Sequence, residues 1–293
     1  MIREIEIEGF KSIERLKLEL GRVTVLIGEN GCGKSNILEA IAFASAAYEE
    51  RLAHEFLASR GIRSTEPRLM RPAFPSSTAQ RMRVKVSAQD RSPIECLFTE
   101  ENSATASGWS ARIVLPAEDG TADRANQEMG SVAVSLAEDM RETFERFLAE
   151  NPEKASVVAE IIEIAARRKV LAPFVAEIDG FVVFSPENSA LRTFVEEGQI
   201  RPIGIKGEGL FDHLRALHRA GKTDVLGELN RRLDLIDWFS GFDIPVDLGP
   251  GEHRLSIRDR YLPDVLLDQR SANEGFLFLL FYYTLLLSPD TPT

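Results

Sequence analysis

The sequence predicts an α/β fold, in which a core with a mixed β-sheet is interrupted by an inserted helical lobe. Two observations indicate this architecture. β-branched strands and a glycine-rich loop begin the chain and run directly into a long helix, as in a βα unit. A strongly apolar helix lies near the C-terminus, after a middle stretch of different character. Apolar residues make up 44% of the 293 residues, enough to bury a large core.

The N-terminal segment contains the clearest elements. Ile2–Gly9 and Leu16–Leu20 alternate apolar and polar residues, as half-buried strands do. Val23–Ile27 is a short run dominated by β-branched residues, which is typical of a buried strand in a parallel sheet. Ser35–Ser59 contains neither glycine nor proline and is rich in alanine, leucine and glutamate, so we expect one long helix there.

The rest of the chain is less regular. Arg60–Gln80 holds three prolines and is expected to be a loop. An antiparallel meander follows it, and then two or three helices that we expect to break near Asn151-Pro152 and Pro173. The expected elements are strands at Met82–Ser87, Pro93–Phe98, Ala111–Leu115 and Phe181–Phe184, helices within Ser131–Ile178 and at Gly207–Ala220 and Thr223–Phe239, strands at Asp243–Leu248, His253–Ile257 and Val265–Leu267, and a last helix at Asn273–Leu287.

One motif points to specific chemistry. The eight residues Gly28, Glu29, Asn30, Gly31, Cys32, Gly33, Lys34 and Ser35 match G-x-x-x-x-G-K-[ST] in full. Its glycines let backbone N–H groups surround phosphate oxygens at a helix N-terminus, which favours anions. Lys34 would reach the β- and γ-phosphates and Ser35 would ligate Mg²⁺, so the motif predicts ATP and Mg²⁺ binding. A chance glycine turn is the competing interpretation, and the strand–loop–helix context argues against it.

The motif also resembles one family. GENGCGKSN is similar to the G-x-N-G-x-G-K-S-N version in ABC-class ATPases of the RecF, SMC and OLD group, which adds Asn36 to the expected contacts. The opening I-E-I-E-G-F-K-S-I resembles the first strand of these proteins, whose turn lies beside the nucleotide. The resemblance implies that Lys11 and Ser12 contact ATP, whereas the residues alone describe a solvated turn equally well.

A second resemblance precedes the C-terminal apolar helix. ABC ATPases place a signature loop at such a position, and here Ser271, Asn273, Glu274 and Gly275 stand before Phe276–Leu287. The resemblance implies that they hold the γ-phosphate of ATP bound to another subunit, with Asn273 where the family has serine. A simple helix cap by Ser271 or Asn273 is the alternative.

A third resemblance is to the second lobe of small RecF-like ATPases, including those of anti-phage systems. It covers Phe184–Arg192 and Ile205–Phe211, and the alternative is that Glu208 and Gly209 simply cap the next helix. The family also carries a glutamine loop, for which Gln80 and Gln89 are candidates. It ends its catalytic strand in two carboxylates, whereas Asp268 stands alone and before the signature, so we assign no catalytic residue. We expect either a truncated ATPase or a regulator that binds nucleotide without hydrolysing it.

Composition excludes other classes of protein. The net charge of −11 excludes binding to nucleic acid over the whole surface. Only Arg60–Lys85 is basic enough for a local DNA contact, and a solvated loop explains it equally well. Two cysteines, Cys32 and Cys96, do not make a disulfide framework and suit the cytoplasm. The apolar run at Phe276–Leu287 is shorter than the ~20 residues that span a bilayer, so no membrane partner is expected.

Together, these patterns predict an ABC-type P-loop ATPase head formed by residues 1–50 and 180–293, with a meander and helical lobe inserted at 51–179. The family resemblance implies a homo-oligomer that dimerises around ATP and acts as a nucleotide-gated switch in a DNA-related or anti-phage complex, together with an effector or nuclease protein. One alternative is the ATPase half of an OLD-like nuclease whose Toprim module lies elsewhere. Another is a scaffold that binds ATP without hydrolysing it.

Overall fold

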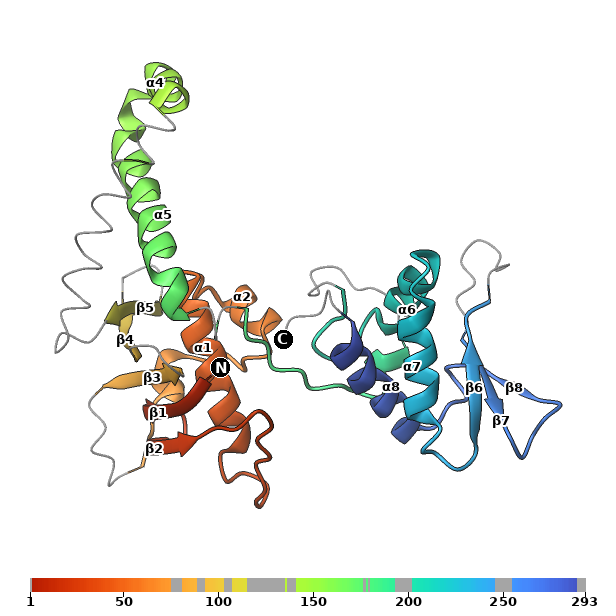
Figure 1. Ribbon diagram of the computed structural model, residues 1–293. Coiled ribbons are helices and arrows are strands. Elements are labelled where there is room, and N and C mark those ends of the chain that lie inside the picture. The colour runs from red at the N-terminus through yellow and green to blue at the C-terminus, as the bar shows by residue number, and fades with distance from the viewer. Residues whose placement is uncertain are drawn as a thin grey trace. The chain divides into compact units, whose positions relative to one another are not determined.

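The computed structural model describes residues 2–74, 81–88, 93–102, 107–114, 135, 141–175, 178, 180–192, 202–245 and 255–288 (Figure 1). The chain forms two compact units. Unit 1 comprises Met1–Leu57 and Ile62–Phe181, and unit 2 comprises Ala58–Gly61 and Val182–Thr293. We describe each unit by itself.

Unit 1 is built on a five-stranded sheet with the order β2-β1-β3-β4-β5. Its strands are β1 (Ile2–Phe10), β2 (Ile13–Glu19), β3 (Met82–Ala88), β4 (Ile94–Asn102) and β5 (Ser107–Val114). Every ladder is antiparallel, and Ile7 lies opposite both Leu16 and Val84. The two expected N-terminal strands and the expected meander are therefore confirmed, and the meander continues the sheet that β1 and β2 begin.

Helix α1 (Lys34–Tyr48) covers the inner face of this sheet (Figure 1). Phe43 is fully buried at the centre of the contact. Its ring lies 5.7 Å from that of Phe10, 4.6 Å from that of Phe98 and 5.9 Å from that of Trp109, measured between centroids. These aromatic contacts join the helix that follows the glycine loop to three strands.

Two expectations for the N-terminal segment are wrong. Ser35–Ser59 is two helices, since the chain turns at Glu50, whose φ is 55°, between α1 and α2 (His54–Ser59). Val23–Ile27 is not a strand, and Val23, Val25 and Ile27 are 84%, 73% and 90% exposed. A strand needs a neighbour to complete its hydrogen-bond ladder, and none of the described strands pairs with this segment. The described sheets are consequently antiparallel rather than mixed.

A helical arm stands off the sheet of unit 1 (Figure 1). It consists of α4 (Arg141–Glu150), the short 3₁₀ turn η2 (Pro152–Lys154) and α5 (Ala155–Val175). The break expected at Asn151 and Pro152 is confirmed, whereas α5 continues past Pro173. A second 3₁₀ turn, η1 (Pro67–Met70), lies in the loop after α2.

Unit 2 packs helices against a small antiparallel sheet. Its elements are η3 (Ala190–Arg192), α6 (Leu210–Arg219), α7 (Thr223–Leu233), β6 (Phe239–Asp243), β7 (Ser256–Asp259), β8 (Leu266–Leu267) and α8 (Glu274–Leu287), and the strands follow the order β6-β7-β8. Leu214, Leu229, Phe276 and Phe281 lie in its buried core. Leu266 is 67% exposed, so β8 is an edge strand and not the core strand expected at Val265–Leu267. No helix of the described ranges is long and apolar enough to cross a membrane.

We expect Phe43→Ala to destabilise unit 1 by about 4 kcal/mol, because it removes the ring that joins α1 to three strands. Phe74→Ala is the matched control, since Phe74 is 50% exposed, and should cost about 1 kcal/mol or less. Urea unfolding followed by Trp109 fluorescence, in a Trp238→Phe background, measures both. Equal losses in the two variants would contradict this account of the core.

Candidate nucleotide-binding site

The glycine loop leads directly into α1 with the backbone that its motif predicts. Gly31 and Gly33 have φ values of 86° and 97°, a left-handed region that residues with side chains seldom adopt. Gly33 is the N-cap of the 15-residue helix α1. The first backbone N–H groups of a helix have no partner within it, and they carry a partial positive charge. The loop and the helix start therefore offer an anion a set of aligned donors.

Lys34 is held against this loop. Its Nζ donates to the carbonyl oxygens of Gly28 at 2.8 Å and Glu29 at 2.6 Å. Ser35 is exposed in the first turn of α1. The Lys34 ammonium and the Ser35 hydroxyl thus lie at the same helix end as the backbone N–H donors. A phosphate with a bound metal ion needs this combination of a cation, a hydroxyl ligand and N–H donors.

A cavity of about 620 Å³ adjoins the loop. It is lined by Ser12, Ile13, Glu14, Arg15, Leu16, Cys32, Gly33, Ile37 and Phe74. Its walls come from the β1–β2 hairpin, the glycine loop and the first turn of α1. The volume falls within the range of roughly 300–1,000 Å³ that small-molecule pockets occupy.

A buried carboxylate fixes the start of α1 to its surroundings. Glu39 is 1% exposed. Lys11 Nζ forms an ion pair with it, and Arg63 Nη2 lies 2.6 Å from Glu39 Oε1. Lys11, whose φ is 48°, also donates to the Arg63 carbonyl at 2.8 Å. Burial lowers the pKa of Lys11 below its ordinary value, although the hydrogen bond to Glu39 opposes this effect.

This network bears on three residues that were expected to contact nucleotide, namely Lys11, Ser12 and Asn36. The Lys11 ammonium is engaged by Glu39, so its contact with ATP stays a prediction. Asn36 Nδ2 donates to Ser12 Oγ at 2.8 Å, and Arg63 Nη2 approaches Asn36 Oδ1 at 3.3 Å. A Cβ atom on Gly33 would lie 3.1 Å from Ser12 Oγ. The turn between β1 and β2 therefore packs closely on the glycine loop.

The second candidate loop lies in unit 2, at the N-terminus of the 14-residue helix α8. Ser271, Asn273, Glu274 and Gly275 are all exposed there. Asn273 is the N-cap, and its Oδ1 accepts the Phe276 N–H at 2.8 Å. The cap that the sequence offered as the alternative is thus present, and it takes up the Phe276 N–H, one of the backbone donors of the first turn.

Two residues that organise this loop were missed by sequence reasoning. Asp268 Oδ1 accepts the backbone N–H groups of Arg270 at 3.0 Å and Ser271 at 2.9 Å, and also the Ser271 hydroxyl at 2.9 Å. Burial raises the pKa of Asp268, but these hydrogen bonds outweigh it and leave the pKa below its ordinary value. An Asp three residues before a Ser is an ordinary signal of such a turn. Arg192, the second residue, approaches from η3.

Comparisons with known proteins agree with the geometry of the glycine loop. Residues 1–100 match the family described as "AAA ATPase domain". A segment of 45 residues is 51% identical to the "DNA double-strand break repair Rad50 ATPase" of Sulfurisphaera tokodaii, and covers 15% of this chain and 5% of that protein. A segment of 50 residues is 46% identical to the "Uncharacterized protein MJECL10" of Methanocaldococcus jannaschii, and covers 17% of this chain and 23% of that protein.

Residues 1–100 are thus similar to AAA/ABC-type ATPases of the RecF/SMC group. The expected family resemblance is therefore confirmed for the part of the chain that carries the glycine loop, β1 to β3 and α1. The matched segments span less than a quarter of the length of either relative.

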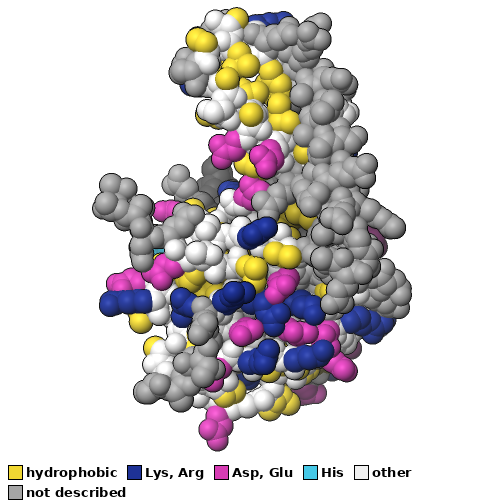
Figure 2. Space-filling model, turned by 90° about the vertical axis from the view of Figure 1, so that its left-hand side faces the viewer, with side chains coloured by type: hydrophobic (Ala, Val, Ile, Leu, Met, Phe, Trp, Pro, Cys, Tyr) yellow, Lys and Arg dark blue, Asp and Glu magenta, His cyan; other side chains and the backbone are white. Residues whose placement is uncertain are grey.

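The basic stretch at Arg60–Lys85 is largely paired with acids. Arg63 contacts Glu39, Arg68 contacts Glu66, and Arg83 contacts Glu8 and Glu95. Lys85 lies 3.5 Å from Glu6. On the face that Figure 2 presents, basic and acidic side chains are interspersed. The described residues of the stretch thus lie in a surface of alternating sign.

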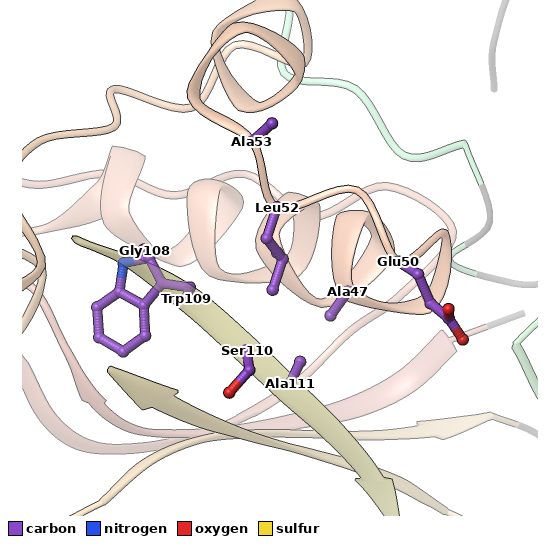
Figure 3. Close-up of a pocket in the computed structure, with 8 residues that line it drawn as sticks. All are labelled: Ala47, Glu50, Leu52, Ala53, Gly108, Trp109, Ser110 and Ala111. Carbon is purple, nitrogen blue, oxygen red and sulfur yellow. The ribbon is translucent and has the colours of Figure 1, made fainter. Parts of the chain in front are cut away.

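A second cavity, of about 420 Å³, lies at the C-terminal end of α1 (Figure 3). Trp109 lines it from β5 and Glu50 from the turn after α1. A helix of this length spans about 22 Å, so this cavity is distinct from the one beside the glycine loop. Gln80 and Gln89, the candidates for a glutamine loop, lie outside the described residues. Within the described ranges, no three side chains of His, Cys, Asp or Glu gather as metal ligands.

We expect Glu39→Gln to lower the stability of unit 1 by about 3 kcal/mol, because it leaves the partly buried Lys11 ammonium without its countercharge. Glu66→Gln is the control, since that carboxylate pairs with Arg68 on the surface and should cost less than about 1 kcal/mol. Urea unfolding compares the two. Similar losses would show that the Glu39 ion pairs do not hold α1.

Proposed function

We propose that Gly28–Ser35 binds Mg²⁺-ATP and that two copies of the chain close around two nucleotides. In this arrangement each glycine loop faces the loop before α8 of the other copy. The observation that carries the proposal is the backbone of the glycine loop. Two left-handed glycines place the aligned donors of a long helix beside the Lys34 ammonium.

The residues present fit the nucleotide. The N–H groups from Gly31 to Ser35 would surround the phosphates, Lys34 would neutralise the β- and γ-phosphates, and Ser35 would ligate Mg²⁺. The cavity between β2, Cys32 and Phe74 has room for the base and sugar. Mg²⁺ held by Ser35 would offset the negative charge of the phosphates.

The loop before α8 suits the far side of a γ-phosphate. Its exposed helix N-terminus favours an anion. The cap uses the amide oxygen of Asn273, which leaves the amide nitrogen and the Gly275 backbone N–H as donors for a phosphate. Each of the two loops can contact only one side of a nucleotide. If the glycine loop of one copy and the α8 loop of the other enclosed ATP, ATP would form part of the interface, and association would depend on the bound nucleotide.

For the process served, we propose a DNA-related role such as repair or anti-phage defence, together with an effector protein. The support is the similarity to a Rad50 ATPase named for DNA double-strand break repair. The pairing of Arg63, Arg68, Arg83 and Lys85 with carboxylates gives no support to a DNA contact at Arg60–Lys85. The OLD-nuclease alternative rests on family resemblance alone.

A scaffold that binds ATP without hydrolysing it is the second candidate. The observation in its favour is Asp268, the acid that follows the apolar run at Val265–Leu267. Its carboxylate is occupied by the turn of Arg270 and Ser271. These hydrogen bonds give the Asp268 carboxylate a structural role in the turn, and turnover measurements separate the two candidates.

We expect wild-type chain to bind a fluorescent ATP analogue in Mg²⁺ and Lys34→Ala to bind it at least about 100-fold more weakly, because the phosphates lose a charge-assisted partner. Lys206→Ala, which removes an exposed lysine paired with Glu187, is the matched control and should bind as wild type. Fluorescence titration measures affinity, and phosphate release measures turnover.

Sedimentation velocity with and without Mg²⁺-ATP then tests the switch. Wild type and Lys206→Ala should associate when ATP is added, whereas Lys34→Ala should not. Equal affinity of Lys34→Ala and wild type for ATP would sink the proposed site. Binding without association would limit the proposal to a nucleotide-binding monomer.

A further inference from the structure

Arg192 donates hydrogen bonds to three backbone carbonyl groups of the loop before α8. Its Nη1 donates to the carbonyl oxygens of Gln269 and Arg270, the latter at 2.9 Å, and its Nη2 donates to that of Ala272 at 2.8 Å. These acceptors lie 77 to 80 positions away in the sequence. Its Nε donates to Asn188 Oδ1 at 3.0 Å, which orients the guanidinium plane.

The side chain is anchored at the other end by the core of unit 2. Leu191, its neighbour in η3, is fully buried in the same cluster as Leu210 and Phe276. The guanidinium therefore starts from a rigid point beneath the loop. A planar fork with five N–H donors can serve several convergent carbonyl oxygens at once, whereas a lysine ammonium cannot match that geometry.

Two charged residues thus bind the backbone of the loop, one through its N–H groups and the other through its carbonyl groups. Asp268 accepts the N–H groups of Arg270 and Ser271, and Arg192 donates to carbonyl groups of the same segment. A carbonyl oxygen that a cation holds presents less negative charge to an approaching phosphate. Both sets of hydrogen bonds order the segment before α8, and the Arg192 guanidinium adds positive charge beside it.

We propose that Arg192 is a positioning residue, which fixes the loop Gln269–Asn273 so that Asn273 and Gly275 face the nucleotide of the other copy. This inference rests on the proposed function, because only closure around ATP gives the ordered loop a ligand. Arg192 acts through the loop carbonyls and not on the phosphates themselves.

The ordering of the loop is tested first, without nucleotide. We expect amide hydrogen exchange at Arg270–Ala272 to become about tenfold faster in Arg192→Lys, because the lysine retains the charge and loses the fork. Exchange in α6 should remain unchanged. Arg231→Lys is the matched control, since it alters a mostly exposed arginine on α7 that pairs with Glu228. Unchanged exchange at Arg270–Ala272 would overturn the proposal, as would unfolding of all of unit 2 in Arg192→Lys.

The role in closure is tested by mixing chains. Arg192→Lys alone should lose ATP-dependent association about tenfold or more, and Lys34→Ala alone should lose it as well. A mixed pair retains one intact composite site, formed by the glycine loop of the first variant and the α8 loop of the second. Association in the mixture should therefore exceed that of either variant, which a general loss of folding in Arg192→Lys would not produce.

Absence of this rescue, with association of wild type intact, would contradict the role of Arg192 in closure. If wild type itself does not associate with ATP, the proposed function fails. In that case the exchange measurement still decides whether Arg192 orders the loop.

Discussion

The ion pairs of Glu39 are the constraint on which the geometry of the nucleotide loop depends. A glycine loop is pliable, and it presents its N–H groups usefully only when the helix behind it is fixed. Glu39 lies on α1 one turn beyond Asn36 and is buried with its charge. Desolvating a carboxylate is costly unless cations compensate it. Lys11 and Arg63 do so from two separate segments, so the position of the helix start is determined by three parts of the chain.

In unit 2, long-range polar contacts also fix the chain before a helix, but there the central residue is a cation and not a carboxylate. There a cation, Arg192, gathers backbone carbonyl groups, and Asp268 takes the N–H groups of the same turn. In both units a helix N-terminus faces outward and a network of long-range polar contacts fixes the chain just before or beside it. Preorganised donors of this kind are effective for anions because they need no rearrangement when a phosphate arrives.

What could be predicted from sequence was local. The glycine loop was predicted because its residues are adjacent and each has a distinct task, and the break at Asn151 and Pro152 followed from proline chemistry. Val23–Ile27 was misread because strand formation depends on a neighbour that composition does not reveal. The turn at Glu50 was missed because a non-glycine residue adopts a positive φ there. Arg192 was quoted only as part of a resemblance, since its acceptors lie far away in sequence.

Charge pairing explains why a run of basic residues can mislead. Arg83 and Lys85 lie on β3, and the antiparallel register sets them opposite Glu8 and Glu6 of β1. Glu95 of β4 approaches Arg83 from the other side. Cross-strand pairs of opposite charge stabilise a sheet and neutralise its face. A polyanion would have to displace these glutamates before it could use the arginines, and the net charge of −11 opposes its approach. Any DNA contact of this protein must therefore be sought on a surface where cations are not already paired, or on a partner.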